Sequence, residues 1–237
     1  SNFAFSPLAA PRAALNFCSF SHGKLRSHYR ADKSPRLNAG HIFILNYIWR
    51  FEPMERKKFP ELIASTRLEL RKHVPELAET MFRYVDQDRE RLRVFLPWVD
   101  TTKSVDDETA YIKMTHATWE KGTFFDYGLF ERETGTYMGN IGAHNIAWAH
   151  DRCELGYWIL GKFEGKGFVS EAVEALGKVC FGLGFHRLEI RCSSINPKSA
   201  AVPRRLGYSL DGTLKEDSLE QGAYRDTMVF GKLNVTL

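Results

Sequence analysis

The clearest periodic pattern of hydrophobic residues lies in the second half of the chain. Hydrophobic side chains recur there at spacings of four, three, four and three residues, which places them on one face of a helix. They are Val169, Val173, Leu176, Cys180 and Leu183. Gly184 follows the last of them, and glycine is common at the C-terminal end of a helix. The pattern therefore predicts an amphipathic helix that stops at Gly184.

A glycine-containing loop joins this helix to the strand predicted before it, at residues 152–160. Gly165 and Gly167 lie in the loop, just before the helix. The backbone N–H groups of a first helical turn have no partner within the helix, and the helix dipole favours an anion there. Glycine also lets a bulky diphosphate approach the backbone. The arrangement favours a phosphorylated cofactor, and an ordinary strand–turn–helix junction is the alternative.

Two well-known phosphate-binding motifs do not fit this loop. A P-loop has the pattern G-x-x-x-x-G-K-[ST], and Phe168 stands where it needs Ser or Thr. The dinucleotide fingerprint G-x-G-x-x-G/A is approximated by residues 165–170. However, residues 162–164 separate it from the strand, and Ser170 replaces its last glycine. The sequence therefore favours neither an NTP-binding P-loop nor an NAD site.

Similar patterns predict the other strands and helices of an α/β fold. Residues 67–71 alternate as in a strand, and Pro75 suits the first turn of a helix through about Tyr84. Ser104 and Asp107 have the spacing of a helix-capping pair, which predicts a helix to about Glu120. The further predicted elements are a short helix at residues 88–94 and strands at residues 124–130, 137–145, 188–193, 208–214 and 227–233.

The net charge of +4 is unevenly distributed along the 237 residues. Residues 1–53 contain seven basic and two acidic residues, which leaves 26 basic and 27 acidic residues for the remainder. A nucleic-acid-binding domain carries its positive charge on the domain itself. We therefore expect no direct contact with nucleic acid.

Residues 1–53 also differ from the rest in pattern. They contain no methionine and no sustained periodicity, and the first methionine is Met54. Their apolar run, residues 42–49, is shorter than the roughly 20 residues that span a bilayer. It also lacks the layout of a secretory signal. We expect a disordered or non-native leader at residues 1–53, a folded domain at residues 54–237, and no membrane contact.

The cysteines indicate a reducing compartment. Cys18, Cys153, Cys180 and Cys192 form no C-x-x-C pair and show no metal-ligand spacing. We expect buried free thiols, no disulfide, no bound metal and a cytoplasmic location.

Four short motifs carry a resemblance to a known family. They are Glu-Leu-Gly-Tyr-Trp-Ile at residues 154–159, Gly-Lys-Gly at 165–167, Asn-Pro-Lys-Ser at 196–199 and Leu-Gly-Tyr at 206–208. In this order and spacing, the chain resembles the GCN5-related N-acetyltransferases (GNAT), in particular the RimJ/RimL-type enzymes that acetylate the N-termini of ribosomal proteins. The similarity covers about residues 61–233. It implies a mixed sheet of six to seven strands with a splayed parallel pair, flanked by helices.

The resemblance implies acetyl-CoA as the co-substrate. Its pantetheine arm would pair with the backbone of Tyr157, Trp158 and Ile159 in the gap between two parallel strands. The family signature Q/R-x-x-G-x-G/A begins here with Lys162, a departure that matters little if the backbone binds the pyrophosphate. The expected pyrophosphate residues are Glu164, Gly165, Lys166, Gly167, Phe168 and Val169, and Asn196 and Ser199 complete the expected cofactor site.

The resemblance also suggests catalytic residues. Many GNAT enzymes protonate the leaving thiolate with a tyrosine seven residues after the position of Asn196, but Pro203 stands there. Ser199 matches the serine that RimL-type enzymes present to the cofactor sulfur, and a helix-capping hydroxyl is its alternative role. Glu154 is the expected base, and a solvent-facing carboxylate is its alternative role. Other acids and histidines remain open as the base: Glu216, Asp217, Glu220, His144 and His150, with Ser218 at the position of the RimL-type acid.

The loop at residues 95–98 is expected to line the acceptor side, through Phe95 and Trp98, unless both are plain core residues. The most plausible acceptor is the N-terminal amine of a protein, and a small-molecule amine is the alternative. A regulatory module that binds acetyl-CoA without catalysis is the alternative from another class. We expect a monomer or a homodimer.

Overall fold

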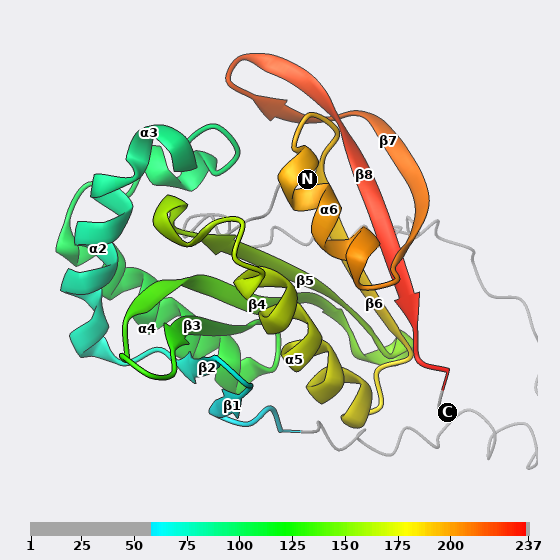
Figure 1. The fold of residues 1–237 in the computed structure, drawn as a ribbon, viewed down its shortest axis with the longest axis horizontal. Helices are drawn as coiled ribbons and strands as arrows, with labels where there is room; N and C mark the ends of the chain where they lie inside the picture. Colours follow the sequence, from blue (N-terminus) through cyan, green and yellow to red (C-terminus); the bar gives the residue numbers. More distant parts are fainter. Residues whose placement is uncertain (1–57, 236–237) are drawn as a thin grey trace, which may run out of the picture. The chain divides into compact units, whose positions relative to one another are not determined.

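The computed structural model describes residues 58–235, which form one mixed sheet flanked by helices (Figure 1). The leader predicted at residues 1–53 lies outside the described residues. The sheet has eight strands in the order β1-β2-β3-β4-β5-β6-β8-β7. The strands are β1 (Leu62–Ala64), β2 (Leu68–Lys72), β3 (Phe125–Glu131), β4 (Tyr137–Ala147), β5 (Arg152–Ile159), β6 (Arg187–Ser193), β7 (Ser209–Glu220) and β8 (Ala223–Leu233). The α-helices are α2 (Ala78–Gln87), α3 (Arg89–Leu92), α4 (Val105–Lys121), α5 (Phe168–Gly182) and α6 (Pro197–Arg205).

The predicted α/β fold with a mixed central sheet is confirmed, and the prediction of six to seven strands is corrected to eight. The additional strand is β1, whose three residues are too few to show a periodic pattern. β7 and β8 are also longer than predicted, because the segment expected to be a loop continues their hairpin. β7 is irregular, with register shifts at two places. These shifts interrupt the alternation of side chains, so the sequence does not show the period of two expected for a strand.

The strands β5 and β6 form the only parallel pair in the described sheet, and they separate part of the way along β5. Their pairing includes three positions and ends at Glu154 opposite Glu189. β4 continues to pair with β5 as far as Ile159, and β8 continues to pair with β6 as far as Ser193. Both strands therefore remain anchored on their outer sides while a gap opens between them, and the predicted splayed pair is confirmed.

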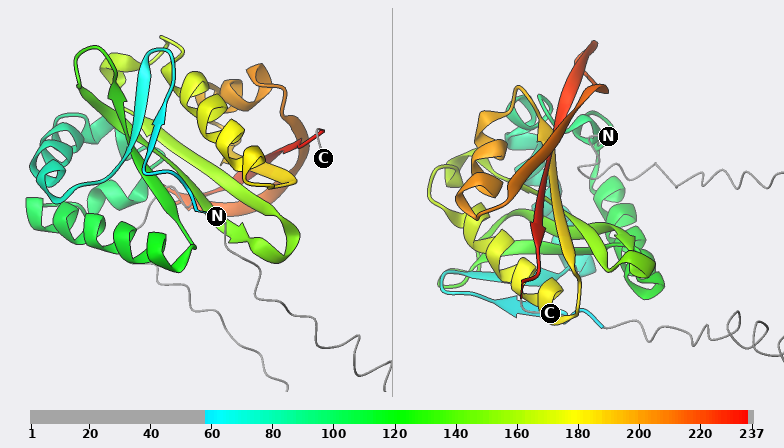
Figure 2. Two further views of the ribbon diagram at one scale, coloured as in Figure 1. Left: turned by 90° about the horizontal axis from the view of Figure 1, so that it is seen from below. Right: turned by 90° about the vertical axis from the view of Figure 1, so that its right-hand side faces the viewer.

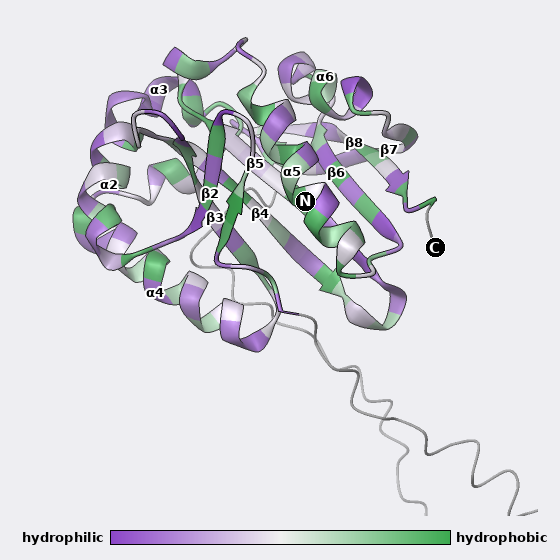
Figure 3. Ribbon diagram, turned by 60° about the horizontal axis from the view of Figure 1, so that its bottom comes forward, coloured by the Kyte–Doolittle hydropathy of each residue, from purple (hydrophilic) through white to green (hydrophobic). Residues whose placement is uncertain are grey.

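Helices cover both faces of the sheet (Figures 1 and 2). α5 and α6 lie on one face, and α2 and α4 lie on the other. Alternate side chains of β5 enter two separate hydrophobic clusters, as the period of two in a strand requires. Leu155 and Ile159 pack in the cluster under α5, whereas Trp158 packs in the cluster under α2 and α4. Figure 3 shows the matching alternation of hydrophobic and hydrophilic residues along the strands.

Both ends of the helix α5 carry a glycine in the left-handed region. Gly167 is the N-cap with φ of +81°, and the helix begins at Phe168. The helix ends at Gly182, two residues before the predicted stop, and Gly184 adopts φ of +86°. The N–H of Phe185 then donates to the carbonyl oxygen of Cys180 (3.1 Å). Glycine is favoured at these two positions because a Cβ disfavours positive φ.

The capping pair predicted for α4 is present. The Ser104 hydroxyl accepts from the Asp107 N–H (3.3 Å), and the Asp107 carboxylate accepts from the Ser104 N–H (2.9 Å). Aspartate therefore fills the place that Glu or Gln takes in the usual capping box.

Two further expectations bear on the rest of the domain. Cys153, Cys180 and Cys192 are buried free thiols, and Cys18 lies outside the described residues. Within residues 58–235, none of the helices combines the length and apolar character needed to cross a bilayer.

Candidate active site

A cavity of about 810 Å³ lies where β5 and β6 separate. Four segments form its walls: the end of β5, the loop and first turn of α5, the beginning of α6, and the chain from α3 to Leu96. We call this cavity the cleft. The predicted residues that line it are Tyr157, Trp158, Ile159, Glu164, Gly165, Gly167, Phe168, Val169, Asn196, Ser199 and Phe95. The remaining predicted residues, Lys166, Glu154 and Trp98, lie outside its lining.

The β5 side of the cleft offers main-chain groups. Beyond Glu154 the β6-facing edge of β5 has no strand partner among the described residues. Backbone N–H and C=O groups are obligatory hydrogen-bonding groups, so an unpaired edge is a ready site for an extended chain that carries amides. One of these groups is already bound, because the Arg91 guanidinium donates to the carbonyl oxygen of Ile159 (2.7 Å).

The first turn of α5 supplies unpaired backbone donors at another wall. Phe168, Val169 and Ser170 line the cleft at the N-terminus of this helix, and no side chain caps it. Such a turn binds anions through its free N–H groups and the helix dipole. Gly165 has φ of +74°, and no described atom lies within 4 Å of a Cβ built on it. The space beside Gly165 is therefore open to a ligand.

An ionic bridge joins three of the residues that line the cleft. Arg91 from α3 pairs with one carboxylate oxygen of Glu164 (2.6 Å), and Lys198 from α6 pairs with the other (2.6 Å). Arg205 also lines the cleft and donates to the hydroxyl of Ser170 (2.9 Å). Three basic side chains therefore line the cleft near the start of α5, although Arg91 also pairs with Asp88, and such groups suit a polyphosphate ligand.

The beginning of α6 separates the roles of Asn196 and Ser199. The side-chain oxygen of Asn196 accepts from the backbone N–H of Ser199 (3.0 Å), so Asn196 is the helix cap. The hydroxyl of Ser199 is not needed for capping and lies 3.4 Å from the hydroxyl of Tyr157. Burial raises the pKa of Tyr157, so its phenol remains protonated at neutral pH. A hydroxyl pair, Tyr157 and Ser199, therefore lies on the cleft wall.

Glu154 lies in a buried cluster on the sheet face opposite α5. One of its oxygens accepts from the Asn145 amide (2.9 Å) and lies 3.6 Å from the Arg191 guanidinium. Its other oxygen lies 3.9 Å from Nε2 of His144, which is also buried. The alternative of a solvent-facing carboxylate is therefore wrong. Glu154 does not line the cleft directly, although it marks the point where the cleft begins.

The other candidate acids lie on β7. Glu220 is buried and accepts from the hydroxyls of Ser193 (2.9 Å) and Ser218 (3.1 Å). Glu216 is exposed, and its backbone N–H donates to Asp226 (3.0 Å). His150 is exposed on the turn after β4. None of these groups, nor Asp217, lines the cleft.

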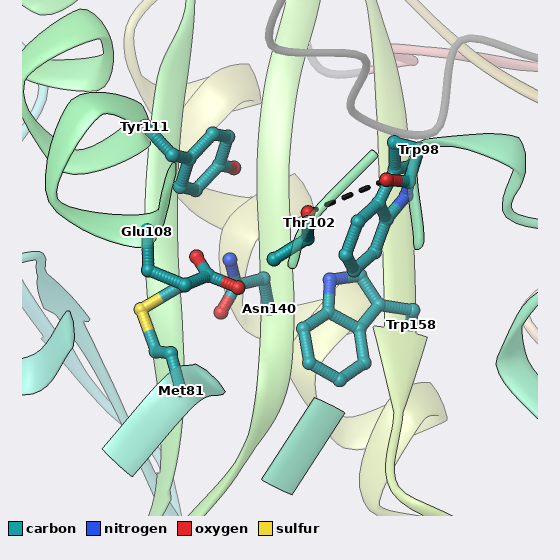
Figure 4. A pocket seen from close by; sticks show the side chains of 7 residues that line it. All are labelled: Met81, Trp98, Thr102, Glu108, Tyr111, Asn140 and Trp158. Atoms are coloured by element: carbon teal, nitrogen blue, oxygen red, sulfur yellow. Dashed lines mark hydrogen bonds between the residues drawn. The ribbon is translucent and has the colours of Figure 1, made fainter. Parts of the chain in front are cut away.

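A second, much smaller pocket of about 10 Å³ contains Trp98 (Figure 4). It is large enough for about one water molecule. Trp158 lines both this pocket and the cleft, and its ring lies 5.6 Å from that of Trp98. The Glu108 carboxyl group faces the same pocket and forms no hydrogen bond or ion pair with any of the described residues. Phe95 therefore lines the cleft itself, whereas Trp98 lies behind Trp158.

Sequence reasoning missed Arg91, Arg205, the side-chain role of Tyr157, and Glu108. Arg91 is 73 residues from its partner Glu164, and no local pattern links the two. Glu108 occupies a helix position next to two other acids, Asp106 and Asp107, so it was indistinguishable from a solvated residue at the start of a helix.

Comparisons with known proteins agree with this geometry. Residues 67–209 match the acetyltransferase (GNAT) domain family, and the chain therefore belongs to that family. The predicted resemblance to RimJ/RimL-type enzymes and the use of acetyl-CoA are confirmed: the protein is an acetyl-CoA-dependent N-acetyltransferase.

Two curated relatives are enzymes of Escherichia coli (strain K12). The [ribosomal protein uS5]-alanine N-acetyltransferase is 29% identical over 179 residues, covering 66% of this chain and 90% of that enzyme. The ribosomal-protein-serine acetyltransferase is 24% identical over 170 residues, covering 71% and 94%. Among solved structures, the RimL ribosomal L7/L12 alpha-N-protein acetyltransferase in complex with coenzyme A has a TM-score of 0.70 at 24% identity. That match covers 73% of this chain and 98% of RimL.

A glycine substitution tests the anion site. Gly165→Ala should weaken acetyl-CoA binding by about tenfold, equivalent to roughly 1.4 kcal/mol, because a Cβ enters the space beside the first turn of α5. Gly135→Ala is the matched control, because Gly135 has φ of +68° and equally open surroundings on a hairpin turn. Titration calorimetry measures both affinities. Equal affinity in the two variants would contradict a phosphate site at this loop.

The buried carboxyl group of Glu108 predicts a pH-dependent stability. Burial, with the nearby charges of Asp126 and Asp107, raises the pKa of Glu108 to about 7. A group with a raised pKa in the folded state stabilises the protein below its ordinary pKa of 4.5, and this contribution is lost as the pH rises through 7. Glu108→Gln should therefore raise the free energy of unfolding at pH 8, by up to roughly 3 kcal/mol, and change it much less at pH 5.

Urea unfolding at the two pH values measures this difference. The exposed Glu120→Gln on the same helix is the control and should show no such pH dependence. An equal effect of Glu108→Gln at pH 5 and pH 8 would show that its carboxyl group is not destabilised by burial.

Proposed function

We propose that this enzyme transfers the acetyl group of acetyl-CoA to the N-terminal α-amine of a protein, with ribosomal proteins as the first candidates. The observation that supports acetyl transfer most strongly is the cleft between β5 and β6, with unpaired main-chain groups on one wall and a free helix N-terminus on another. The acceptor class is supported by the named activities of two relatives, which modify ribosomal-protein N-termini. Such an enzyme would act in the cytoplasm, as a monomer or homodimer.

The residues of the cleft fit the two ends of coenzyme A. The backbone of Tyr157, Trp158 and Ile159 would bind the pantetheine amides along the open edge of β5. The backbone of residues 164–169, including Lys166, would bind the pyrophosphate at the start of α5. Arg91, Lys198 and Arg205 lie beside that turn and would balance its charge. When bound, acetyl-CoA supplies an activated thioester carbonyl.

Two groups of this chain would then move protons. The Ser199 hydroxyl, next to the Tyr157 hydroxyl, would donate a proton to the departing thiolate, the role that Pro203 cannot fill. A base near the start of the gap, either Glu154 itself or a group that it supports, would take the proton of the attacking amine. Asn196 holds the turn that presents Ser199.

The acceptor would approach from the side of Phe95 and Trp158. Phe95 lines the cleft, and Trp98 supports Trp158 from behind. Aromatic walls suit the first side chain of a peptide better than a nucleic-acid backbone, which would need a basic surface.

A panel of N-terminal peptides tests this function. Thiol release from acetyl-CoA is measured with peptides that begin with Ser, Ala, Met or Thr, and with N-terminally blocked copies as controls. We expect turnover with unblocked peptides only. Turnover with small amines alone would replace the proposed acceptor, and tight acetyl-CoA binding without turnover on any amine would indicate a regulatory module.

The proposed acid is tested by Ser199→Ala. Turnover should fall by about 10²-fold, at the lower end of the range for general acid catalysis, because a thiolate leaves readily. Acetyl-CoA affinity and stability should change little, because Asn196, not Ser199, caps α6. The exposed Ser194→Ala is the control and should retain full activity. A raised KM with unchanged kcat would instead mark Ser199 as a binding residue.

A further inference from the structure

His144 occupies a specific position on the sheet face opposite α5. Its side chain comes from β4 and is buried, and Nε2 has no hydrogen-bond partner among the described residues. Buried polar atoms are nearly always hydrogen-bonded, so an unpaired ring nitrogen requires an explanation. On the neighbouring strand, His144 is the register partner of Glu154, the last β5 residue that pairs with β6. His144 therefore lies beside the start of the gap, next to the residues that line the cleft and not among them.

The absence of a side chain at Gly156 brings this nitrogen against the backbone of the cofactor strand. A Cβ built on Gly156 would lie only 2.7 Å from Nε2 of His144. Gly156 is two residues beyond the last β5–β6 pair, so its backbone borders the gap. Its partner on β4, Gly142, also lacks a side chain. The imidazole therefore packs directly against the Gly156 backbone, just beyond the last paired residue of β5 and β6.

The surroundings favour the neutral imidazole, and two nearby carboxylates partly offset this effect. Burial lowers the pKa of His144, and Arg191 on β6 acts in the same direction. Glu154 on β5 and Asp126 on β3 oppose the shift. A neutral imidazole at pH 7 can accept a proton, and the nearest carboxylate oxygen, that of Glu154, lies 3.9 Å from Nε2.

Glu154 is better placed to support a base than to be one. Its second oxygen is already engaged by Asn145 and lies near Arg191, and only its first oxygen lies toward His144. A histidine backed by a fixed carboxylate is a common arrangement for proton transfer, because the carboxylate stabilises the imidazolium that forms.

We propose that His144 is the general base of the acetyl transfer and that Glu154 is its positioning residue. The proposal rests on the proposed function and identifies the base for that reaction. The amine lone pair forms the C–N bond with the acetyl carbon, the C–S bond breaks, and sulfur leaves with the electron pair. Nε2 of His144 takes the N–H proton, and Ser199 protonates the thiolate. Solvent then takes the proton from the imidazolium and restores the one on Ser199.

The test compares His144→Gln with His186→Gln, which changes an exposed histidine just before β6. His144→Gln should lower kcat and kcat/KM on an acceptor peptide by between about 10²- and 10⁴-fold, with unchanged acetyl-CoA affinity by calorimetry. In the wild type, kcat should fall as the pH drops through a pKa below 6.5, and this decline should be absent in His144→Gln. His186→Gln should match the wild type in both measurements.

Two further variants separate catalysis from structure. In His144→Ala, added imidazole should restore part of the lost rate, which a purely structural role does not predict. Glu154→Gln should lower the pH at which kcat falls, because the imidazolium loses its partner. Full activity of a folded His144→Gln protein, or an unchanged acid decline in that variant, would overturn the proposal. If no peptide is acetylated, the acceptor assignment fails, and the same comparison with whichever small amine is acetylated still decides the role of His144.

Discussion

The end of β5–β6 pairing at Glu154 is the constraint on which the rest of the site depends. Two neighbouring parallel strands would normally satisfy each other's backbone groups, and here the outer partners β4 and β8 hold them apart beyond that point. Backbone groups left unpaired in the interior carry a free-energy cost unless a ligand or water satisfies them. The fold thus maintains a site shaped for an extended chain with amides, and a bound pantetheine arm would satisfy groups that the sheet leaves open.

The two faces of the sheet carry different kinds of residues around this gap. On the α5 face, the free helix N-terminus and the cations Arg91, Lys198 and Arg205 suit phosphate. The opposite face carries the buried group of Glu154 and His144, and further along it the Trp158 and Trp98 rings. Alternation along β5 connects the two faces, since successive side chains of one strand point to opposite sides. A single strand therefore contributes both to the wall of the cleft and to the buried Glu154–His144 group.

The sequence was sufficient for features that depend on local patterns. The spacing from Val169 to Leu183 predicted α5, and the glycine loop predicted at its start is present, with Gly167 as the N-cap. Contacts between distant segments could not be predicted, such as the bridge from Arg91 to Glu164 or the approach of Nε2 of His144 to Gly156. Those contacts depend on strand register and side-chain direction, which one sequence does not reveal. The same limit explains why the sequence could not separate Phe95, which lines the cleft, from Trp98, which lies in the smaller pocket behind Trp158.

Amide hydrogen exchange with and without acetyl-CoA tests the central claim most directly, because exchange reports on individual backbone groups. If the separated strands hold the cofactor, acetyl-CoA should slow exchange in two segments: Tyr157 to Ile159 on β5, and residues 164–169 at the start of α5. The β7–β8 hairpin, whose strands already pair with each other, should change little. Binding that is evident by calorimetry but leaves exchange in both segments unchanged would contradict a cofactor site between β5 and β6.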